Sequence, residues 1–149
     1  MTHIVDNKGR IILSGCFILN ENKEILLLHR KDHNHYETPG GKANIDECED
    51  PNDPSEEELR KIAEREVYEE LGSDISLAPL EYFGSVEFTV PDGRIAVANK
   101  FLTKILSGEP QLAEPEVFDR FDYISIIDLE NKNISSDLKL FLDKLNLQS

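Results

Sequence analysis

Five runs of hydrophobic residues, rich in β-branched and aromatic side chains, are the most regular feature of the chain. Each is bounded by polar residues, glycine or proline, which is typical of strands in a sheet. The runs are residues 10–19, 24–30, 80–90, 94–106 and 121–127. Short turns separate the first run from the second and the third from the fourth, so we expect two hairpins. The last run alternates between hydrophobic and polar residues and is interpreted as an edge strand.

Two further segments have hydrophobic residues at helical spacing. In residues 55–71, Ser55 is a suitable N-cap, Glu58 completes a capping box, and Gly72 follows as a C-terminal stop. Residues 136–145 have the pattern of an amphipathic helix. Polar, acidic or proline-containing stretches are expected to be loops, and Pro-Gly-Gly is expected to interrupt any regular element. These stretches are residues 31–37, 38–42, 48–54 and 109–116. The order of elements predicts an α/β fold.

Length and composition narrow the class of protein. The 149 residues are enough for one domain, residues 1–149, with its own core. The net charge of −14 argues against a nucleic acid polymer or an anionic membrane as the main partner, because both are bound by positive surfaces. No hydrophobic run is long enough to span a bilayer, and no secretory signal is visible at the N-terminus. Cys16 and Cys48 form no CxxC pair, so we expect a cytoplasmic protein.

The negative charge is concentrated in residues 46–70. This segment contains twelve acidic and three basic residues, a net charge of −9, which leaves −5 for the other 124 residues. On a helix with about 100° per residue, part of this segment forms a hydrophobic stripe. The stripe consists of Leu59, Ile62, Ala63 and Val67. Glu66 and Glu70 fall inside the stripe, and Glu69 falls at its border.

These three glutamates allow two explanations. A glutamate-rich helix usually presents a solvated face, but such a face would place its carboxylates away from Ile62 and Val67. Carboxylates at i, i+3 and i+4 also repel one another, and partial burial makes that repulsion more costly. A divalent cation removes the conflict, and ligands that are all oxygen select a hard ion. We therefore expect a site for Mg²⁺, with Mn²⁺ as a substitute.

The Gly40-Gly41 pair lies between a predicted strand and this helix. Pro-Gly-Gly alone indicates only a turn, but its position suggests a second role. A glycine pair lets backbone N–H groups approach an anion closely, and Lys42 and Arg30 would offer cations at the same place. Since Mg²⁺ often completes its shell with phosphate oxygens, we expect these four residues to bind the substrate beside the metal.

Two stretches of the chain resemble the signature of the Nudix family, which is Gly, five residues, Glu, seven residues, then Arg-Glu-aliphatic-any-Glu-Glu-any-Gly-aliphatic. Gly41 and Glu47 have the first spacing. Residues 65–72, Arg-Glu-Val-Tyr-Glu-Glu-Leu-Gly, match every fixed position of the second half. Ser73 departs from the pattern, because it stands in place of the final aliphatic residue.

A second departure is the gap between Glu47 and Arg65, which holds 17 residues instead of seven. The extra residues form an insertion of ten in the region 48–57. Glu57 therefore competes with Glu47 as the first glutamate of the pattern. We prefer Glu47, because a loop can absorb the insertion while the Gly-to-Glu spacing is kept.

The resemblance implies an α/β/α sandwich around a mixed, partly antiparallel sheet. It also implies Mg²⁺-dependent hydrolysis of a nucleoside diphosphate linked to another moiety. Carried over by position, the metal ligands would be Glu66, Glu69, Glu70, Glu47 and a glutamate of the late loop. For that last ligand Glu114 and Glu116 are the alternatives, and Glu116 is taken as the candidate. Arg65 would hold the carboxylates through ion pairs, and Glu66 or Glu69 would act as the base.

The expected substrate is a small nucleotide, bound by a monomer or a homodimer. The first hypothesis is a MutT-like nucleoside triphosphate pyrophosphohydrolase that releases NMP and pyrophosphate. In the region after the box, the chain lacks the proline typical of ADP-ribose hydrolases and the tyrosine typical of dinucleoside-polyphosphate hydrolases. An ADP-ribose or NDP-sugar pyrophosphatase stays open. A nucleotide-binding module without catalysis would typically have lost carboxylates that this chain keeps. A protein-interaction domain with an acidic face would bind its partner without metal.

Histidine and aromatic residues suggest weaker hypotheses. His29, His33 and His35 could suggest a transition-metal site. His33 and His35 lie in a polar loop with no third ligand at a familiar spacing, so ordinary loop histidines, which touch the substrate at most, are favoured. Four aromatic residues are candidates for stacking on a base, although core packing is expected for at least two. They are Tyr36, Tyr82, Phe83 and Phe88.

Overall fold

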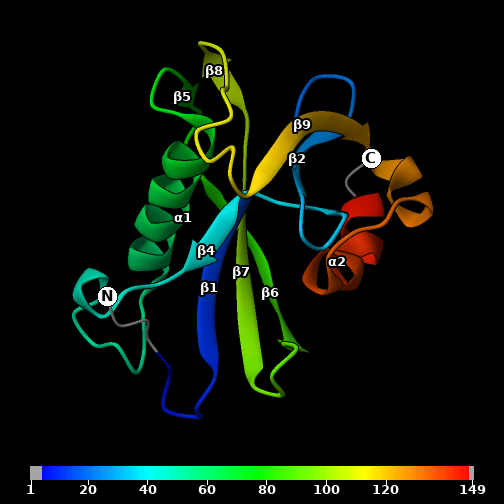
Figure 1. Cartoon of the computed structure of the whole chain (residues 1–149). Coiled ribbons are helices and arrows are strands. Elements are labelled where there is room, and N and C mark those ends of the chain that lie inside the picture. Colours follow the sequence, from blue (N-terminus) through cyan, green and yellow to red (C-terminus); the bar gives the residue numbers. More distant parts are fainter. Residues whose placement is uncertain (1–4, 148–149) are drawn as a thin grey trace.

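The computed structural model describes residues 5–147 and places two helices on opposite sides of a set of strands (Figure 1). The strands are β1 (Ile11–Ile18), β2 (Glu24–Arg30), β3 (His35–Glu37), β4 (Gly40–Lys42), β5 (Ser76–Leu77), β6 (Glu81–Thr89), β7 (Ile95–Thr103), β8 (Ile105–Ser107) and β9 (Phe118–Ser125). The helices are α1 (Glu56–Leu71), α2 (Ser136–Asn146) and two short 3₁₀ helices, η1 (Ile45–Glu47) and η2 (Ile126–Asn131). Residues 1–4 and 148–149 lie outside the described part of the chain. We expected one domain over residues 1–149 and no secretory signal at the N-terminus, and both expectations stay predictions.

The central sheet is mixed, as expected. Its strand order is β4-β1-β7-β6, with β1 and β7 parallel and the other neighbours antiparallel. A second, antiparallel sheet has the order β3-β2-β9, and β5 pairs with β8. The predicted pairing of the third and fourth hydrophobic runs is confirmed, because they are the antiparallel pair β6 and β7.

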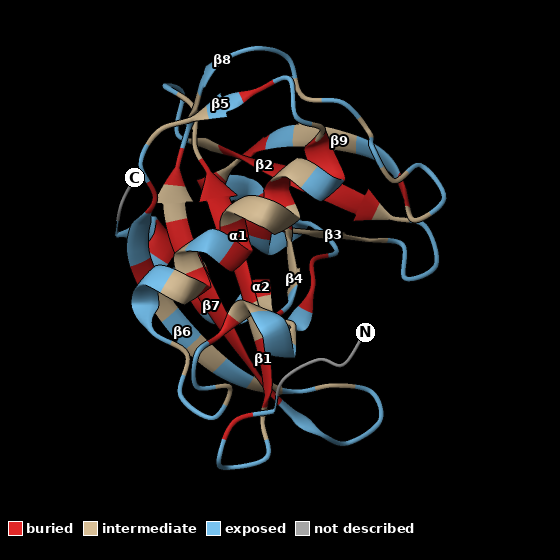
Figure 2. Ribbon diagram, turned by 90° about the vertical axis from the view of Figure 1, so that its left-hand side faces the viewer, coloured by how far each residue is buried: buried red, intermediate tan, exposed pale blue. Residues whose placement is uncertain are grey.

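The two faces of β1 contribute to two hydrophobic clusters, one under each helix. Cys16 and Ile18 pack with the buried stripe of α1, whereas Phe17 packs with Phe141 of α2. Burial on both faces explains why β1 shows no alternation of hydrophobic and polar residues. In Figure 2, which views the molecule from the side of α1, buried residues follow the strands of the sheet, whereas exposed residues lie on the outer surface of α1. The α/β/α arrangement expected from the sequence is therefore confirmed.

Helix α1 begins and ends where its local signals predict. The Ser55 hydroxyl accepts from the N–H of Glu58, and the Glu58 carboxylate accepts from the N–H of Ser55, which completes the capping box. Gly72 ends the helix with φ 86°, in the region that favours glycine. Helix α2 is also confirmed, with one further residue at its C-terminal end.

The predicted hairpin of the first two runs is wrong. Strands β1 and β2 share a single bridge, Leu19 to Ile25, and then diverge into different sheets. Both edges of β1 are already paired, with β4 on one side and β7 on the other, so no edge is left for β2. Hydrophobic pattern alone does not choose between such partners.

Two segments predicted as loops contain strands. Residues 35–37 form β3 beside β2, and residues 40–42 form β4 beside β1. The glycines permit β4 because it lies very close beside β1: a Cβ on Gly40 would lie 2.8 Å from the Cα of Gly15. The run 94–106 is split into β7 and β8, and the last run begins earlier, at Phe118, as an edge strand of its sheet.

Candidate active site

The C-terminal half of α1 lies against β4 and turns its glutamates toward the glycine pair. Glu70 is only 3% exposed, and its Oε1 accepts from the Gly40 N–H at 2.8 Å. Glu66 lies directly over Gly41, where a Cβ would be 2.5 Å from the Glu66 carboxylate. The Glu69 side chain is about half exposed, at 48%. These positions agree with the helical projection, which put Glu66 and Glu70 inside the hydrophobic stripe and Glu69 at its border.

Arg65 connects three carboxylates that approach from two elements. Its Nε and Nη2 donate to both oxygens of Glu47, at 2.6 and 2.8 Å. Its Nη1 donates to Glu66 at 3.0 Å and to Glu69 at 2.9 Å, and Nη2 also reaches the carbonyl of Lys42. Burial alone would lower the pKa of Arg65, but its hydrogen bonds to the carboxylates raise it. Arg65 is therefore positively charged and fixes the geometry of the glutamates.

The carboxylates near Arg65 are still in electrostatic conflict. Burial raises the pKa of Glu70 well above its ordinary value, against the lowering effect of the Gly40 N–H, and the charges of Glu66 and Glu114 raise it further. Burial also raises the pKa of Glu66, opposed by Arg65 and reinforced by Glu69. Removing carboxylates from water and placing them together makes the ionised site unstable without a counter-charge.

The donor set fits a hard divalent cation in its chemistry, because it consists of carboxylate oxygens only. Among residues 5–147 no three acidic, histidine or cysteine side chains already converge as a metal-binding group. Glu66 and Glu69 instead share one nitrogen of Arg65. Mg²⁺ needs only one or two direct carboxylates, since it usually keeps several waters.

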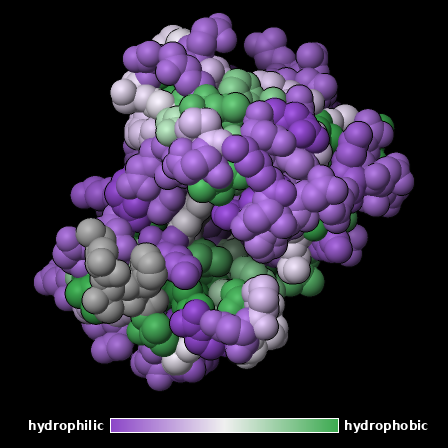
Figure 3. Space-filling view, viewed as in Figure 1, coloured by the Kyte–Doolittle hydropathy of each residue, from purple (hydrophilic) through white to green (hydrophobic). Residues whose placement is uncertain are grey.

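A cavity of about 450 Å³ opens beside the glycine pair on the face of the sheet that α2 covers. Arg30, Gly40, Gly41 and Lys42 all line it, as predicted for substrate-binding residues. Arg30 lies over the ring of Phe118 and donates to Glu37, which keeps its guanidinium in place. Figure 3 shows a central hollow with hydrophobic side chains gathered below it, over the strands of the central sheet.

Part of this cavity was not foreseen from the sequence. Its lining also includes Thr38, Lys100, Ser135 and Asp137, which come from three separate segments. The sequence signal that could have pointed there is Lys100, a charged residue in the middle of the hydrophobic run 94–106. His33, His35 and Phe88 line the cavity as well, whereas Phe83 packs in the core under α2.

Residues 10–145 of the chain match the model of the NUDIX domain. The chain belongs to the Nudix family. No curated protein matches the sequence. As a Nudix hydrolase, the protein acts on pyrophosphate bonds, and members of its family generally use divalent metal ions such as Mg²⁺.

Solved structures with the Nudix fold are similar to the chain over almost its whole length. A MutT protein from Methanosarcina mazei Go1 is 23% identical, with a TM-score of 0.72 over 93% of this chain and 94% of that one. A MutT Nudix hydrolase from Burkholderia pseudomallei is 22% identical, with a TM-score of 0.69 over 90% and 96% of the two chains. A bifunctional NMN adenylyltransferase/ADP ribose pyrophosphatase from Francisella tularensis is 21% identical, with a TM-score of 0.61 over 91% of this chain and 41% of that one. These identities support the fold.

The inserted residues of the Nudix box leave the pair of Glu47 and Arg65 intact. Glu47 ends η1, and its Oε1 also accepts from the N–H of Asn44, which orients it toward Arg65. Glu57 lies in the first turn of α1 and pairs with Arg60. The geometry therefore favours Glu47 over Glu57 as the first glutamate of the box.

The late loop brings Glu114, rather than the candidate Glu116, to the Nudix carboxylates. Backbone hydrogen bonds from Gln111 and Ala113 to the last turn of α1 hold this loop in place. Burial raises the pKa of Glu114, and the nearby charges of Glu69 and Glu116 raise it further. Glu116 is exposed, and its charge raises the pKa of Glu114. The conformation of the late loop decides which of the two glutamates lies near the Nudix carboxylates, and this conformation could not be predicted from the sequence pattern.

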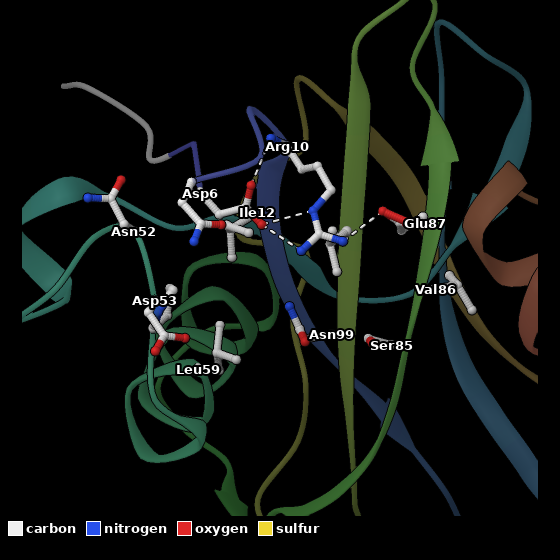
Figure 4. Close-up of a pocket in the computed structure, with 13 residues that line it drawn as sticks. Asp6, Arg10, Ile12, Asn52, Asp53, Leu59, Ser85, Val86, Glu87 and Asn99 are labelled. Carbon is white, nitrogen blue, oxygen red and sulfur yellow. Dashed lines mark hydrogen bonds and ion pairs between the residues drawn. The ribbon is translucent and has the colours of Figure 1, made fainter.

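A second cavity, of about 560 Å³, lies on the side of the sheet that faces α1 (Figure 4). Asn52, Asp53 and Pro54 of the insertion form one wall. Across the cavity, the guanidinium of Arg10 spans Asp6 and Glu87. The lining contains none of the Nudix glutamates.

Among residues 5–147, no helix is long and apolar enough to cross a membrane.

Proposed function

We propose that this Nudix hydrolase is a Mg²⁺-dependent nucleoside triphosphate pyrophosphohydrolase, which releases a nucleoside monophosphate and pyrophosphate. The observation that supports it is the junction of two unlike surfaces at β4. Buried, mutually repelling carboxylates lie on one side of the glycine pair, and a cavity with Arg30 and Lys42 at its edge lies on the other. A phosphate chain at this junction would meet both the metal ligands and the cations.

Bound Mg²⁺ would neutralise phosphate oxygens and lower the pKa of the attacking water. Glu66, Glu69 and Glu70, with Glu114 from the late loop in place of Glu116, are proposed to hold it. Glu47 supports them through Arg65. Glu66 or Glu69 is proposed to accept the proton of the attacking water.

A triphosphate is preferred as substrate because the MutT structures are similar over nearly the full length of both chains. ADP-ribose is the second candidate, favoured by the likeness to the Francisella tularensis bifunctional protein, whose name includes ADP ribose pyrophosphatase. We also propose a cytoplasmic location, supported by two buried cysteines that are both free. A monomer or homodimer stays a prediction.

The test is incubation with Mg²⁺ and a panel of nucleoside triphosphates, ADP-ribose and NDP-sugars, with the products identified by chromatography and phosphorus NMR. We expect pyrophosphate and NMP from triphosphates, and no product when EDTA removes the metal. Faster cleavage of ADP-ribose to AMP and ribose 5-phosphate would support the second candidate. Nucleotide binding without any product would indicate a non-catalytic module, and would contradict the proposal.

A further inference from the structure

The cavity beside the glycine pair has a buried polar end that takes no part in the proposed catalysis. Lys100 of β7 is 4% exposed, and its ammonium donates to the Thr38 hydroxyl at 2.6 Å. The same ammonium lies 3.4 Å from a carboxylate oxygen of Asp137, in the first turn of α2. Lys100 and Asp137 thus form a largely buried ion pair that lines the cavity.

Ser135 adds a group at this end that has no hydrogen-bond partner. It is the residue before α2, is 7% exposed and lines the cavity. Its hydroxyl is the one buried side-chain oxygen or nitrogen without a partner among residues 5–147. Burial raises the pKa of the nearby Asp137 carboxyl, whereas Lys100 and Ser135 lower it. The Ser135 hydroxyl nevertheless lacks the geometry of a hydrogen bond to Asp137. A buried hydroxyl without a partner is costly, and a ligand in the cavity can supply that partner.

The remaining walls suit a flat aromatic ring. Leu13 of β1 and Phe88 of β6 line the cavity, and Val90 and Pro91 continue the same wall. The polar end offers an ammonium that can only donate, a carboxylate that only accepts, and a hydroxyl that does both. A nucleobase presents a flat face and an edge with a donor next to an acceptor. A phosphate at this end would instead face the charge of Asp137.

Resting on the proposed function, we propose that Lys100, Ser135 and Asp137 recognise the hydrogen-bonding edge of the substrate's nucleobase, and that this triad determines which base is accepted. The phosphates would then extend toward Gly41 and Lys42, which line the same cavity. A site that pairs with a base edge rejects bases that leave its buried polar groups without partners.

The test is calorimetric binding of nucleoside monophosphates that differ only in their base, with metal chelated so that hydrolysis plays no part. Wild type binds one base or one edge type more tightly than the others. Ser135→Ala weakens binding of that nucleotide about three- to tenfold, the effect of one hydrogen bond, and changes the others less. Asp137→Asn reduces the preference about tenfold or more, because a charged partner is lost. The exposed Asp143→Asn in the same helix is the matched control and leaves the preference unchanged.

Two results would overturn this inference. One is equal affinity of wild type for every monophosphate. The other is a loss in Ser135→Ala that is the same for all bases. Thermal unfolding of Ser135→Ala distinguishes a folding defect, since removal of an unpaired hydroxyl should leave the midpoint unchanged or raised. Failure of the hydrolysis panel, by contrast, would contradict the proposed function without altering this binding result.

Discussion

At the scale of single residues, the site is built from carboxylates placed where carboxylates are normally unstable. Glu70 is buried beside hydrophobic residues of α1, and one backbone N–H from Gly40 compensates it only in part. The helical projection found this position because burial of α1 follows a simple period. It did not find Lys100 or Ser135, since their surroundings come from strands and loops distant in sequence.

Glu70→Gln should stabilise the metal-free protein at pH 7. The substitution keeps an acceptor for the Gly40 N–H and removes a buried charge. We expect the free energy of unfolding in EDTA to increase by about 1 kcal/mol or more, the scale of the cost of a buried charged group that is incompletely hydrogen-bonded. Urea denaturation measures it, with the exposed Glu130→Gln as control. A decrease would show that the ionised Glu70 is stabilising.

Glu47 and Glu57 provide a matched pair for the first glutamate of the Nudix box. Glu47→Gln weakens the support of Arg65, so we expect kcat/KM to fall about 10- to 100-fold, as is usual for residues that orient metal ligands. Glu57→Gln loses an exposed ion pair with Arg60 and should keep nearly full activity. The reverse order of effects would assign the role to Glu57.

At the scale of elements, local signals predicted helix α1 and the β6–β7 hairpin correctly, but they did not predict the partners of β1 and β2. The capping box and Gly72 predicted α1 because they act within a few residues. The partners of β1 and β2 depend on strands far along the chain, which explains the incorrect hairpin. The strand β4 was missed because Gly40-Gly41 has the composition of a turn, although its role is close approach to β1.

Two glycine substitutions in β4 should therefore affect different properties, one mainly activity and the other mainly thermal stability. At Gly41 an added methyl meets the flexible Glu66 side chain, so Gly41→Ala displaces a proposed metal ligand. We expect at least a tenfold loss of kcat/KM with a smaller change in thermal midpoint. At Gly40 the methyl meets the backbone of Gly15, so Gly40→Ala should lower the midpoint by several degrees. Calorimetry and an activity assay on both variants separate the two; equal losses of stability would contradict this distinction.

At the scale of the whole molecule, the net charge of −14 is concentrated around one helix, so stability depends on pH and metal together. Glu66, Glu70 and Glu114 have pKa values above their ordinary value of 4.5. A carboxyl raised in this way stabilises the fold below pH 4.5 and loses that contribution as pH rises through the folded pKa. Asp6 acts in the opposite sense, because hydrogen bonds from Arg10 outweigh burial and lower its pKa.

The metal-free protein should therefore lose stability as pH rises from about 4.5 toward neutrality, and Mg²⁺ should restore it. The affinity for Mg²⁺ should rise over the same interval, because the ligands must be deprotonated to bind. Thermal unfolding between pH 4 and 8, with EDTA or with excess Mg²⁺, measures both trends. A metal-induced shift that is constant across this interval would contradict the assignment of these carboxyls as ligands.

The most direct measurement is calorimetric titration of the metal-free protein with Mn²⁺ and Mg²⁺ at neutral pH, in wild type and in Glu66→Gln. We expect saturable binding of both ions to wild type and at least about a tenfold weaker affinity in the variant, with Glu130→Gln unchanged. If wild type takes up neither ion, or if Glu66→Gln binds both as tightly, the carboxylates over β4 are not the metal site of this hydrolase.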